Sequence, residues 1–244
     1  FNGSTGNPFL MPMESKQYDA SLEWYFSRVG SLTFSLFYKD LNNFFLNGAY
    51  ERQFTNPVSG VEQTVFISGP QNGGEGKMQG FELGYTQFYD MLPSPFDGFG
   101  IQANYSYIEA RGVPNSGLED SDEGGVAEFS GEMPLQGQSD HTANFVLMYD
   151  KYDWSVRLAY NWRSEYLLTS RDVITGLPVY NDDQGFMDGS IFYNVNENVQ
   201  VGFQAVNLLN TETRTFSQVD DNLKVGRSWF INDRRYTFLV RANF

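Results

Sequence analysis

Charged and polar side chains recur at alternate positions of one aromatic segment, where they could hold a polar solute. Arg157, Asn161 and Arg163 alternate with large apolar residues, and Glu165 and Tyr166 follow them. Guanidinium, amide, carboxylate and phenol groups on one face can bind such a solute through hydrogen bonds and charge. The predicted substrate-binding residues are Arg157, Asn161, Arg163, Glu165, Tyr166, Asp188 and Arg235. The alternative is that these charges pair with one another or with protein packed beside them.

Catalytic chemistry has little basis in this sequence. His141 is the only histidine and follows Asp140 directly, while cysteine is absent. A hydrolase built on this histidine would need a nucleophile at a recognisable spacing, and none is present. We therefore expect no catalytic residues, no metal ligands and no cofactor, and we interpret His141 as structural.

The candidate residues need a rigid frame, and the sequence predicts one made of amphipathic β-strands. Apolar and polar residues alternate strictly in nine segments, which is the pattern of strands with one buried face rather than of helices. The segments are residues 16–27, 31–46, 76–90, 99–110, 139–150, 154–168, 185–195, 199–209 and 227–244. The predicted fold class is all-β, with a sheet that is antiparallel or closed.

The composition indicates that lipid covers the apolar face. Aromatic residues make up 17% of the chain, although its mean hydropathy is only −0.42. No apolar run approaches the roughly 20 residues that a spanning helix needs. Lipid-facing rings that alternate with polar lumen residues are typical of a transmembrane β-barrel. The net charge of −14 argues against nucleic acid as a partner.

The connections between the predicted strands alternate in length. Short connections cover residues 28–30, 91–98, 151–153 and 196–198, and long ones cover 47–75, 111–138, 169–184 and 210–226. Bacterial outer-membrane barrels have short periplasmic turns, long extracellular loops and an even number of strands. Because nine is odd, we interpret residues 1–244 as the C-terminal part of a larger barrel, with the last residue at the periplasmic end.

Three acidic clusters lie in segments that are predicted to be loops. The acidic residues are Glu119, Asp120, Asp122, Glu123, Asp182, Asp183, Asp220 and Asp221. They are either solvated loop charges or sites where a cation bridges carboxylates to the phosphates of lipopolysaccharide and other outer-membrane lipids. None follows the twelve-residue calcium-loop pattern.

Seven short motifs resemble, in the same order, the late barrel strands of TonB-dependent receptors. Each motif is weakly specific alone, but together they span essentially the whole chain. The motifs are residues 6–15 (GNPFLMPMES), 38–44 (YKDLNNF), 80–85 (GFELGY), 140–144 (DHTAN), 160–163 (YNWR), 206–210 (VNLLN) and 234–237 (RRYT). One departure is Met13, which stands where the family usually has glutamate.

The resemblance implies a bacterial outer-membrane transporter with about 22 strands around an N-terminal plug. Its partners would be the TonB complex, reached through an N-terminal region outside this sequence, and a small-molecule substrate. A surface lipoprotein over the barrel is an open alternative. Aromatic and acidic loops slightly favour a carbohydrate over a ferric siderophore, and a passive porin or adhesin is the other alternative.

The last predicted strand also resembles the C-terminal signal that the barrel-assembly machinery recognises. Tyr236, Phe238 and Val240 place large apolar side chains at every second position, and Phe244 is the last residue. Packing alone would explain the apolar face but not the terminal aromatic residue. We expect these four residues to direct barrel assembly.

Overall fold

Nine antiparallel strands form the main sheet of this protein. The computed structural model describes residues 2–43, 45–72, 75–111, 133–169, 172, 175, 177–220 and 222–243. The strand order is β16-β13-β12-β9-β8-β7-β6-β3-β2. The strands are β2 (Glu14–Ser27), β3 (Gly30–Asn42), β6 (Gly76–Phe88), β7 (Phe99–Arg111), β8 (His141–Lys151), β9 (Trp154–Arg163), β12 (Gln184–Asn196), β13 (Val199–Val206) and β16 (Arg235–Ala242). The nine predicted strands are confirmed, and in the described residues β2 and β16 remain the open edges of the sheet.

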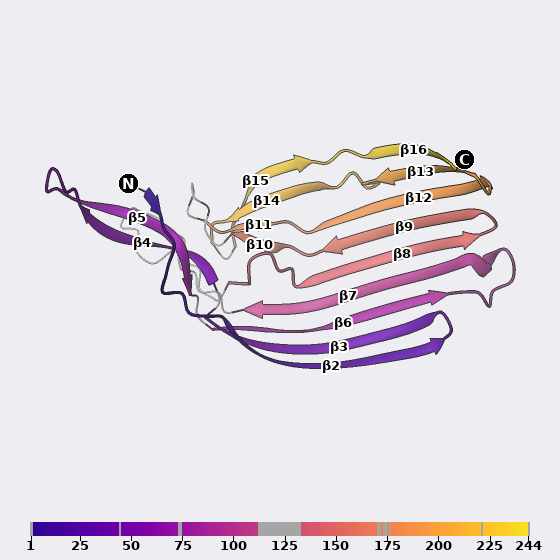
Figure 1. Cartoon of the computed structure of the whole chain (residues 1–244), viewed down its shortest axis with the longest axis horizontal. Coiled ribbons are helices and arrows are strands. Elements are labelled where there is room, and N and C mark those ends of the chain that lie inside the picture. Colours follow the sequence, from indigo (N-terminus) through magenta and orange to yellow (C-terminus); the bar gives the residue numbers. More distant parts are fainter. Residues whose placement is uncertain are drawn as a thin grey trace.

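The short connections all lie at one end of this sheet, called the turn end from here on (Figure 1). The tight turn between β8 and β9 has positive φ angles at Tyr152 and Asp153, 53° and 65°. A 3-10 turn, η1 (Phe96–Gly98), forms part of the connection between β6 and β7. The described C-terminal residues also lie at the turn end, and the long connections lie at the opposite, loop end. This arrangement agrees with the predicted alternation.

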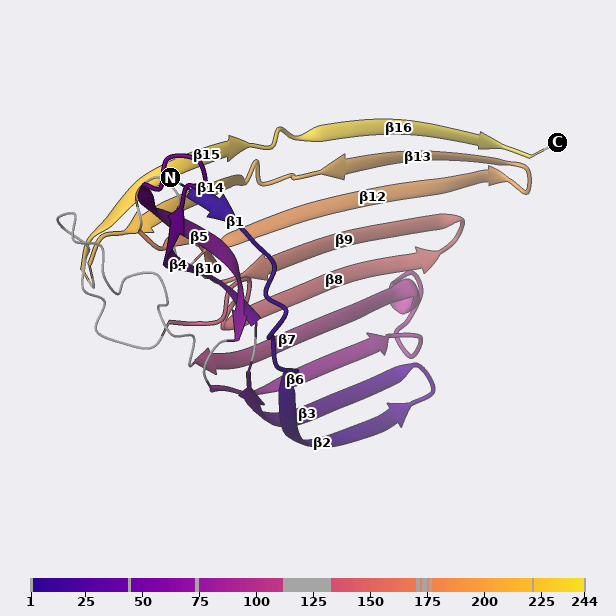
Figure 2. The ribbon, with the colours of Figure 1, turned by 60° about the vertical axis from the view of Figure 1, so that its left-hand side comes forward.

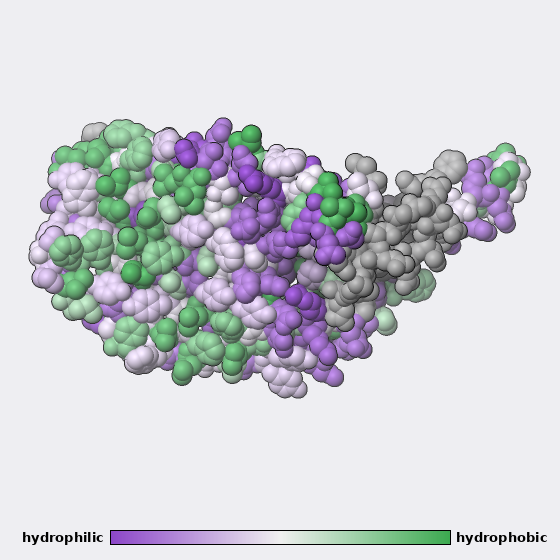
Figure 3. All heavy atoms as spheres, turned by 180° about the vertical axis from the view of Figure 1, so that it is seen from behind, coloured by the Kyte–Doolittle hydropathy of each residue, from purple (hydrophilic) through white to green (hydrophobic). Residues whose placement is uncertain are grey.

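The strand registers give the sheet one continuous apolar face. Leu36 pairs with Phe81, Phe81 with Tyr107, and on the far side of the sheet Phe203 pairs with Phe238. Phe238 is 71% exposed in the chain alone. An uncovered aromatic surface of this extent is unfavourable in water and is typical of a lipid-facing wall. Figure 3 shows hydrophobic residues toward the turn end and hydrophilic residues gathering toward the loop end.

The opposite face of the sheet is largely polar. Asn104 pairs with Asn144, and Asn144 pairs with Asn161. Alternation along each strand therefore places the polar side chains together on what we call the inner face. Apolar exceptions on this face include Val146.

Two smaller sheets lie at the loop end (Figure 2), mostly in segments that the sequence predicts to be loops. One has the order β1-β5-β4, and the other has the order β10-β11-β14-β15. The strands are β1 (Asn2–Ser4), β4 (Phe45–Thr55), β5 (Glu62–Asn72), β10 (Tyr166–Thr169), β11 (Val179–Asn181), β14 (Glu212–Gln218) and β15 (Lys224–Ile231). Their sequences lack a long apolar alternation, so the period-two signal that predicts strands is weak there.

Two predicted strands are divided in the structure. Segment 154–168 divides into β9 and β10, and segment 227–244 divides into β15 and β16. At the second break, the Nε of Arg234 donates to the carbonyl oxygen of Leu208 at 3.1 Å. Apolar alternation continues past the first break, from Trp162 to Tyr166 and Leu168. At the second break the polar run 232–235 interrupts it, and the apolar positions change phase from Trp229 and Ile231 to Tyr236 and Phe238. No helix in the described part of the chain is long and apolar enough to cross a membrane.

The packed cluster of buried apolar residues in the described part of the chain lies at the loop end, and the buried residues of the nine-stranded sheet, such as Val146, are outside it. Leu167 has no exposed surface, and Met133 is 4% exposed. Leu135 and Tyr180 pack against this pair. This small core holds the segment before β8 against β10 and β11, and thereby fixes the side chains described next.

Candidate substrate-binding site

Five of the predicted binding residues project from the inner face. Arg157, Asn161 and Arg163 occupy alternate positions of β9, and Asp188 lies opposite Ala159 on β12. Arg235 begins β16 and pairs with Val206. Neighbouring strands are about 4.8 Å apart, so Arg235, three strands from β9, is roughly 14 Å from the β9 residues.

An open hollow at the inner face brings two of these residues together. Arg157 and Asp188 line a space of about 360 Å³, together with Ser190 and Gln204. The hollow therefore presents a cation, a carboxylate, a hydroxyl and an amide to one solute. This mixture of donors and acceptors suits a neutral polar molecule better than an ion of either sign.

Arg163 marks the point where β9 reaches the loop end. Its Nε donates to the hydroxyl oxygen of Ser139 at 2.8 Å, and its second terminal nitrogen donates to the carbonyl oxygen of Gly137 at 2.8 Å. Its guanidinium carbon lies 3.8 Å from the ring centroid of Tyr166. The structure thus brings Arg163 and Tyr166 together, as the sequence predicts. The Arg163 guanidinium, however, already binds Ser139, Gly137 and the Tyr166 ring within the protein.

Glu165 belongs to an exposed cluster of charge and aromatic rings on the second small sheet. The ammonium of Lys224 donates to the carboxylate of Glu165 at 2.9 Å and lies 4.4 Å from the ring centroid of Phe216. The Phe216 ring stacks on Tyr180, with centroids 5.6 Å apart and planes within 7°. Burial, and next the charge of Glu165, raises the pKa of the Tyr180 phenol above its ordinary value. The phenol therefore stays neutral and can donate a hydrogen bond.

An ion pair between a buried carboxylate and an exposed guanidinium fixes the connection between β10 and β11. Arg227 donates to the carboxylate of Asp172 at 2.6 Å, and Asp172 is 6% exposed. Burial opposes ionisation of this carboxyl group, but hydrogen bonds from Thr175 and the charge of Arg227 outweigh it, and the pKa of Asp172 lies below its ordinary value. Asp172 is therefore a structural carboxylate at neutral pH.

Asp188 also has a structural partner, so its carboxylate is not free to bind a solute with both oxygens. Its Oδ1 accepts the backbone N–H of Asn207 at 2.8 Å. Asn207 has a positive φ of 56° and is 3% exposed. Its side chain accepts the N–H of Thr211 at 2.8 Å and donates to the carbonyl oxygen of Asn232. The turn after β13 is therefore built around Asn207.

Sequence reasoning missed the residues that organise this site. Asp172, Tyr180 and Lys224 stand in segments without periodicity, and Ser139 is the first residue of the predicted segment 139–150. Only the folded chain brings these residues to β10. Asn207 lies inside the VNLLN motif, so that motif was an available signal for a structural turn. Asp188 and Arg163 contribute to this framework as well as to the candidate site.

His141 lies on the outer, aromatic face of β8. Its Nδ1 is 2.7 Å from the Tyr105 hydroxyl, and its ring centroid is 5.0 Å from that of Tyr107. Neighbouring Asp140 instead pairs with Arg111 at 3.1 Å. This environment agrees with the structural interpretation of His141.

The carboxylates that the structure describes do not gather into a metal site. No group of three potential ligands occurs within the described ranges. Asp220 accepts the amides of Asn222 and Leu223 at 2.8 and 2.9 Å. Asp182 accepts the amide of Asp183 at 3.0 Å. Cluster 119–123 and Asp221 lie outside the described residues, and cation bridging by the acidic loops stays a prediction.

Comparisons with known proteins agree with this architecture. Residues 1–208 match the family model described as "TonB dependent receptor-like, beta-barrel". No curated protein matches the chain. Solved structures with a similar fold include a ferric enterobactin receptor (PfeA) mutant from Pseudomonas aeruginosa in complex with enterobactin, with a TM-score of 0.61, 16% identity and coverage of 98% of this chain and 33% of that one.

Two further solved structures extend the comparison. The ferric-catecholate import receptor Fiu from K12 E. coli has a TM-score of 0.59 and 18% identity over 95% of this chain and 27% of its own. The copper transporter OprC has a TM-score of 0.59 and 16% identity over 97% of this chain and 32% of its own. The chain thus spans about a third or less of the length of these structures, and identities at this level support the fold alone.

Proposed function

The chain belongs to the TonB-dependent receptor family, and from this premise we propose that it forms part of an active transporter for a scarce nutrient. The family consists of β-barrel proteins of the bacterial outer membrane that transport rather than catalyse. The observation that carries the proposal is the nine-stranded sheet, with one continuous apolar face and one polar face that leads to organised side chains at the loop end.

We propose that residues 1–244 form the C-terminal part of the barrel. Earlier strands would pair with the open edges at β2 and β16, and a plug domain would fill the lumen. Apolar inner-face positions such as Val146 and Leu239 suit contact with a packed plug better than contact with water. In this proposal the TonB complex acts on an N-terminal region outside the sequence, and that pull opens a path for a bound solute.

The described charges favour a neutral solute, and we propose a carbohydrate as the first substrate class to test. Three cations at the loop end, Lys224, Arg227 and Arg214, are each paired with a carboxylate, and Arg157 shares its hollow with the carboxylate of Asp188. An anionic chelate would need cations that are free to bind it. Tyr166, stacked on Arg163, lies beside the polar inner face, and aromatic faces suit the apolar faces of sugar rings.

Ferric-siderophore uptake by the same fold is the second candidate. It is favoured by the solved structures with a similar fold, several of which are named as receptors for ferric chelates. A passive porin or adhesin is the third candidate. The two small sheets favour a receptor over an open pore because they add ordered strands at the loop end, beyond the main sheet.

The decisive experiment measures uptake by cells that carry the complete protein. Radiolabelled oligosaccharides and ferric chelates are offered separately, with and without a functional TonB complex. We expect accumulation of an oligosaccharide that is lost without TonB. If the cells accumulate ferric chelates and no oligosaccharide, the substrate is a ferric chelate and not a carbohydrate. Uptake that persists without TonB would support the passive porin.

A further inference from the structure

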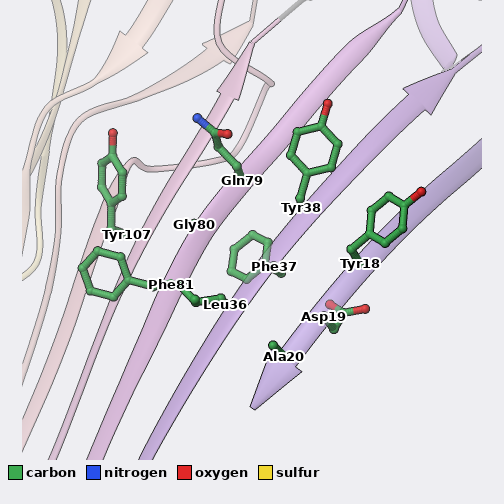
Figure 4. Close-up of a pocket in the computed structure, with 10 residues that line it drawn as sticks. All are labelled: Tyr18, Asp19, Ala20, Leu36, Phe37, Tyr38, Gln79, Gly80, Phe81 and Tyr107. Carbon is green, nitrogen blue, oxygen red and sulfur yellow. The ribbon is translucent and has the colours of Figure 1, made fainter. Parts of the chain in front are cut away.

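An apolar groove lies on the outer face of the sheet, near the loop end of β2, β3, β6 and β7. Its volume is about 540 Å³. Figure 4 shows the apolar side chains of Leu36 and Phe81 lower in the groove and the hydroxyls of Tyr18, Tyr38 and Tyr107 pointing together toward the loop end. Tyr18 is 72% exposed and Leu36 is 49% exposed. The groove therefore has an apolar floor and a rim of phenols, as expected for a site at the lipid–water boundary.

A row of charged residues lies directly above the groove, toward the loop end. Lys16 pairs with Asp40, Asp40 with Lys77, and Lys77 with Arg111 in successive registers. Lys16 and Lys77 stand two residues from the groove residues Tyr18 and Gln79, so they share the outer face. Both lysines are exposed.

Carboxylates also occupy this level, and they limit which cations are available. Asp140 pairs with Arg111 at 3.1 Å, and Glu109 accepts a hydrogen bond from Gln79 at 3.1 Å. Asp40 lies between the two lysines. Lys16 and Lys77 are therefore the cations that face outward, about 10 Å apart across two strand spacings.

We propose that this outer-face site binds lipopolysaccharide from the outer leaflet. An acyl chain lies in the groove, the tyrosine hydroxyls meet the sugar headgroup, and two phosphates contact Lys16 and Lys77. Phosphate oxygens accept strong hydrogen bonds from lysine ammonium groups. A lipid with two phosphates fits two separated lysines, whereas an ordinary phospholipid offers only one phosphate. This site goes beyond the proposed transport function, because it lies on the face opposite the solute path.

The test is native mass spectrometry of the complete protein, purified from outer membranes in mild detergent. The double variant Lys16→Ala/Lys77→Ala removes both phosphate contacts. The matched control, Lys39→Ala/Arg28→Ala, makes the same charge change at a position on the inner face and at one at the turn end, where the Arg28 side chain is 86% exposed. Loss of two exposed ion pairs predicts a roughly 2- to 30-fold drop in retained lipopolysaccharide, with the control unchanged.

A second variant tests the groove without a change of charge. Ala20→Trp places a ring on the groove floor, while Leu22→Trp adds a ring lower on the same face of β2, outside the groove. We expect only Ala20→Trp to weaken retention. Because both positions are exposed, the heat-modified gel mobility should show a folded barrel in each case.

The lipid is identified by adding back intact lipopolysaccharide, its dephosphorylated form or phosphatidylethanolamine. We expect only intact lipopolysaccharide to rebind with full affinity. Equal binding of the dephosphorylated form, preference for phosphatidylethanolamine, or unchanged retention by Lys16→Ala/Lys77→Ala would each overturn the proposal.

Discussion

The guanidinium carbon of Arg163 lies 3.8 Å from the ring centroid of Tyr166, only three residues further along the chain. This stack spans the break between β9 and β10. The same guanidinium donates to Ser139 and to the carbonyl oxygen of Gly137, which precede β8. Arg163 therefore ties the inner face of the main sheet to the small sheet above it.

The first prediction concerns this tie. Arg163→Lys keeps the charge but loses the planar stack and the fork of donors, and we expect the β10 region to lose about 1–3 kcal/mol of local stability. Hydrogen exchange at the Gly137 amide, which donates to the carbonyl oxygen of Leu167 at 2.8 Å, measures the change as a roughly 5- to 150-fold loss of protection. Tyr166→Phe keeps the ring and serves as the control. Equal protection in wild type and Arg163→Lys would show that the tie is not structural.

A second prediction follows from the buried carboxylate of Asp172. Its pKa in the folded protein lies below the ordinary value of 3.8. The stabilisation it provides is therefore complete above the ordinary pKa and is lost as pH falls through the lower, folded-state value. Wild type should protect the Thr175 amide, which donates to Asp172 at 3.3 Å, more strongly than Asp172→Asn does at about pH 7.

The difference between these two proteins tests the pH dependence. The intrinsic exchange rate of the Thr175 amide is the same in wild type and in Asp172→Asn, so it cancels in the comparison. The remaining pH dependence of the difference in protection comes from the Asp172 carboxylate. The difference should shrink as pH falls below the ordinary pKa of 3.8 and through the lower pKa of the folded protein. A difference that stays constant through this range would contradict a stabilising ionised Asp172.

Sequence patterns predicted the main sheet well because apolar and polar residues must alternate along the whole length of a strand that spans the membrane. β7 illustrates this, since Tyr105 and Tyr107 face lipid while Asn104 and Ser106 face inward. A shift of the strand register by one residue would exchange the two faces. The loop-end strands have no such constraint. β11 pairs with β14 although some 30 residues separate them, and local periodicity carries no information about that pairing.

The candidate site was predicted only in part for the same reason. Arg157, Asn161 and Asp188 follow from face alternation and were placed correctly on the inner face. Their partners were not predictable, because Lys224 reaches Glu165 and Arg227 reaches Asp172 across more than 50 residues. The substrate-binding role of all seven residues stays a prediction.

The third prediction concerns strand glycines. A Cβ at Gly80 would overlap the carbonyl oxygen of Tyr107, whereas a Cβ at Gly189 would make ordinary contacts of 3.5 Å. We expect Gly80→Ala to destabilise the barrel by about 1–3 kcal/mol and Gly189→Ala to change it little. Thermal unfolding in detergent compares the two variants. A stable Gly80→Ala protein would mean that β6 and β7 can separate without cost.

The last prediction tests which face of β16 meets lipid. Phe238 pairs with Phe203 on the apolar face, and neighbouring Thr237 pairs with Gln204 on the inner face. Arginine on the lipid face costs about 2–4 kcal/mol at the bilayer midplane, while lumen positions tolerate charge. Phe238→Arg should therefore lower the amount of folded protein in the outer membrane, and Thr237→Arg should not.

The same assay addresses the predicted barrel-assembly signal. Tyr236, Phe238 and Val240 share the apolar face of β16, and Phe244 lies outside the described residues. Phe238→Tyr keeps an aromatic ring at the signal position and should restore assembly, because the machinery is expected to read the aromatic pattern. If Phe238→Arg assembles as well as Thr237→Arg, then β16 neither faces lipid at this position nor contributes an assembly signal there.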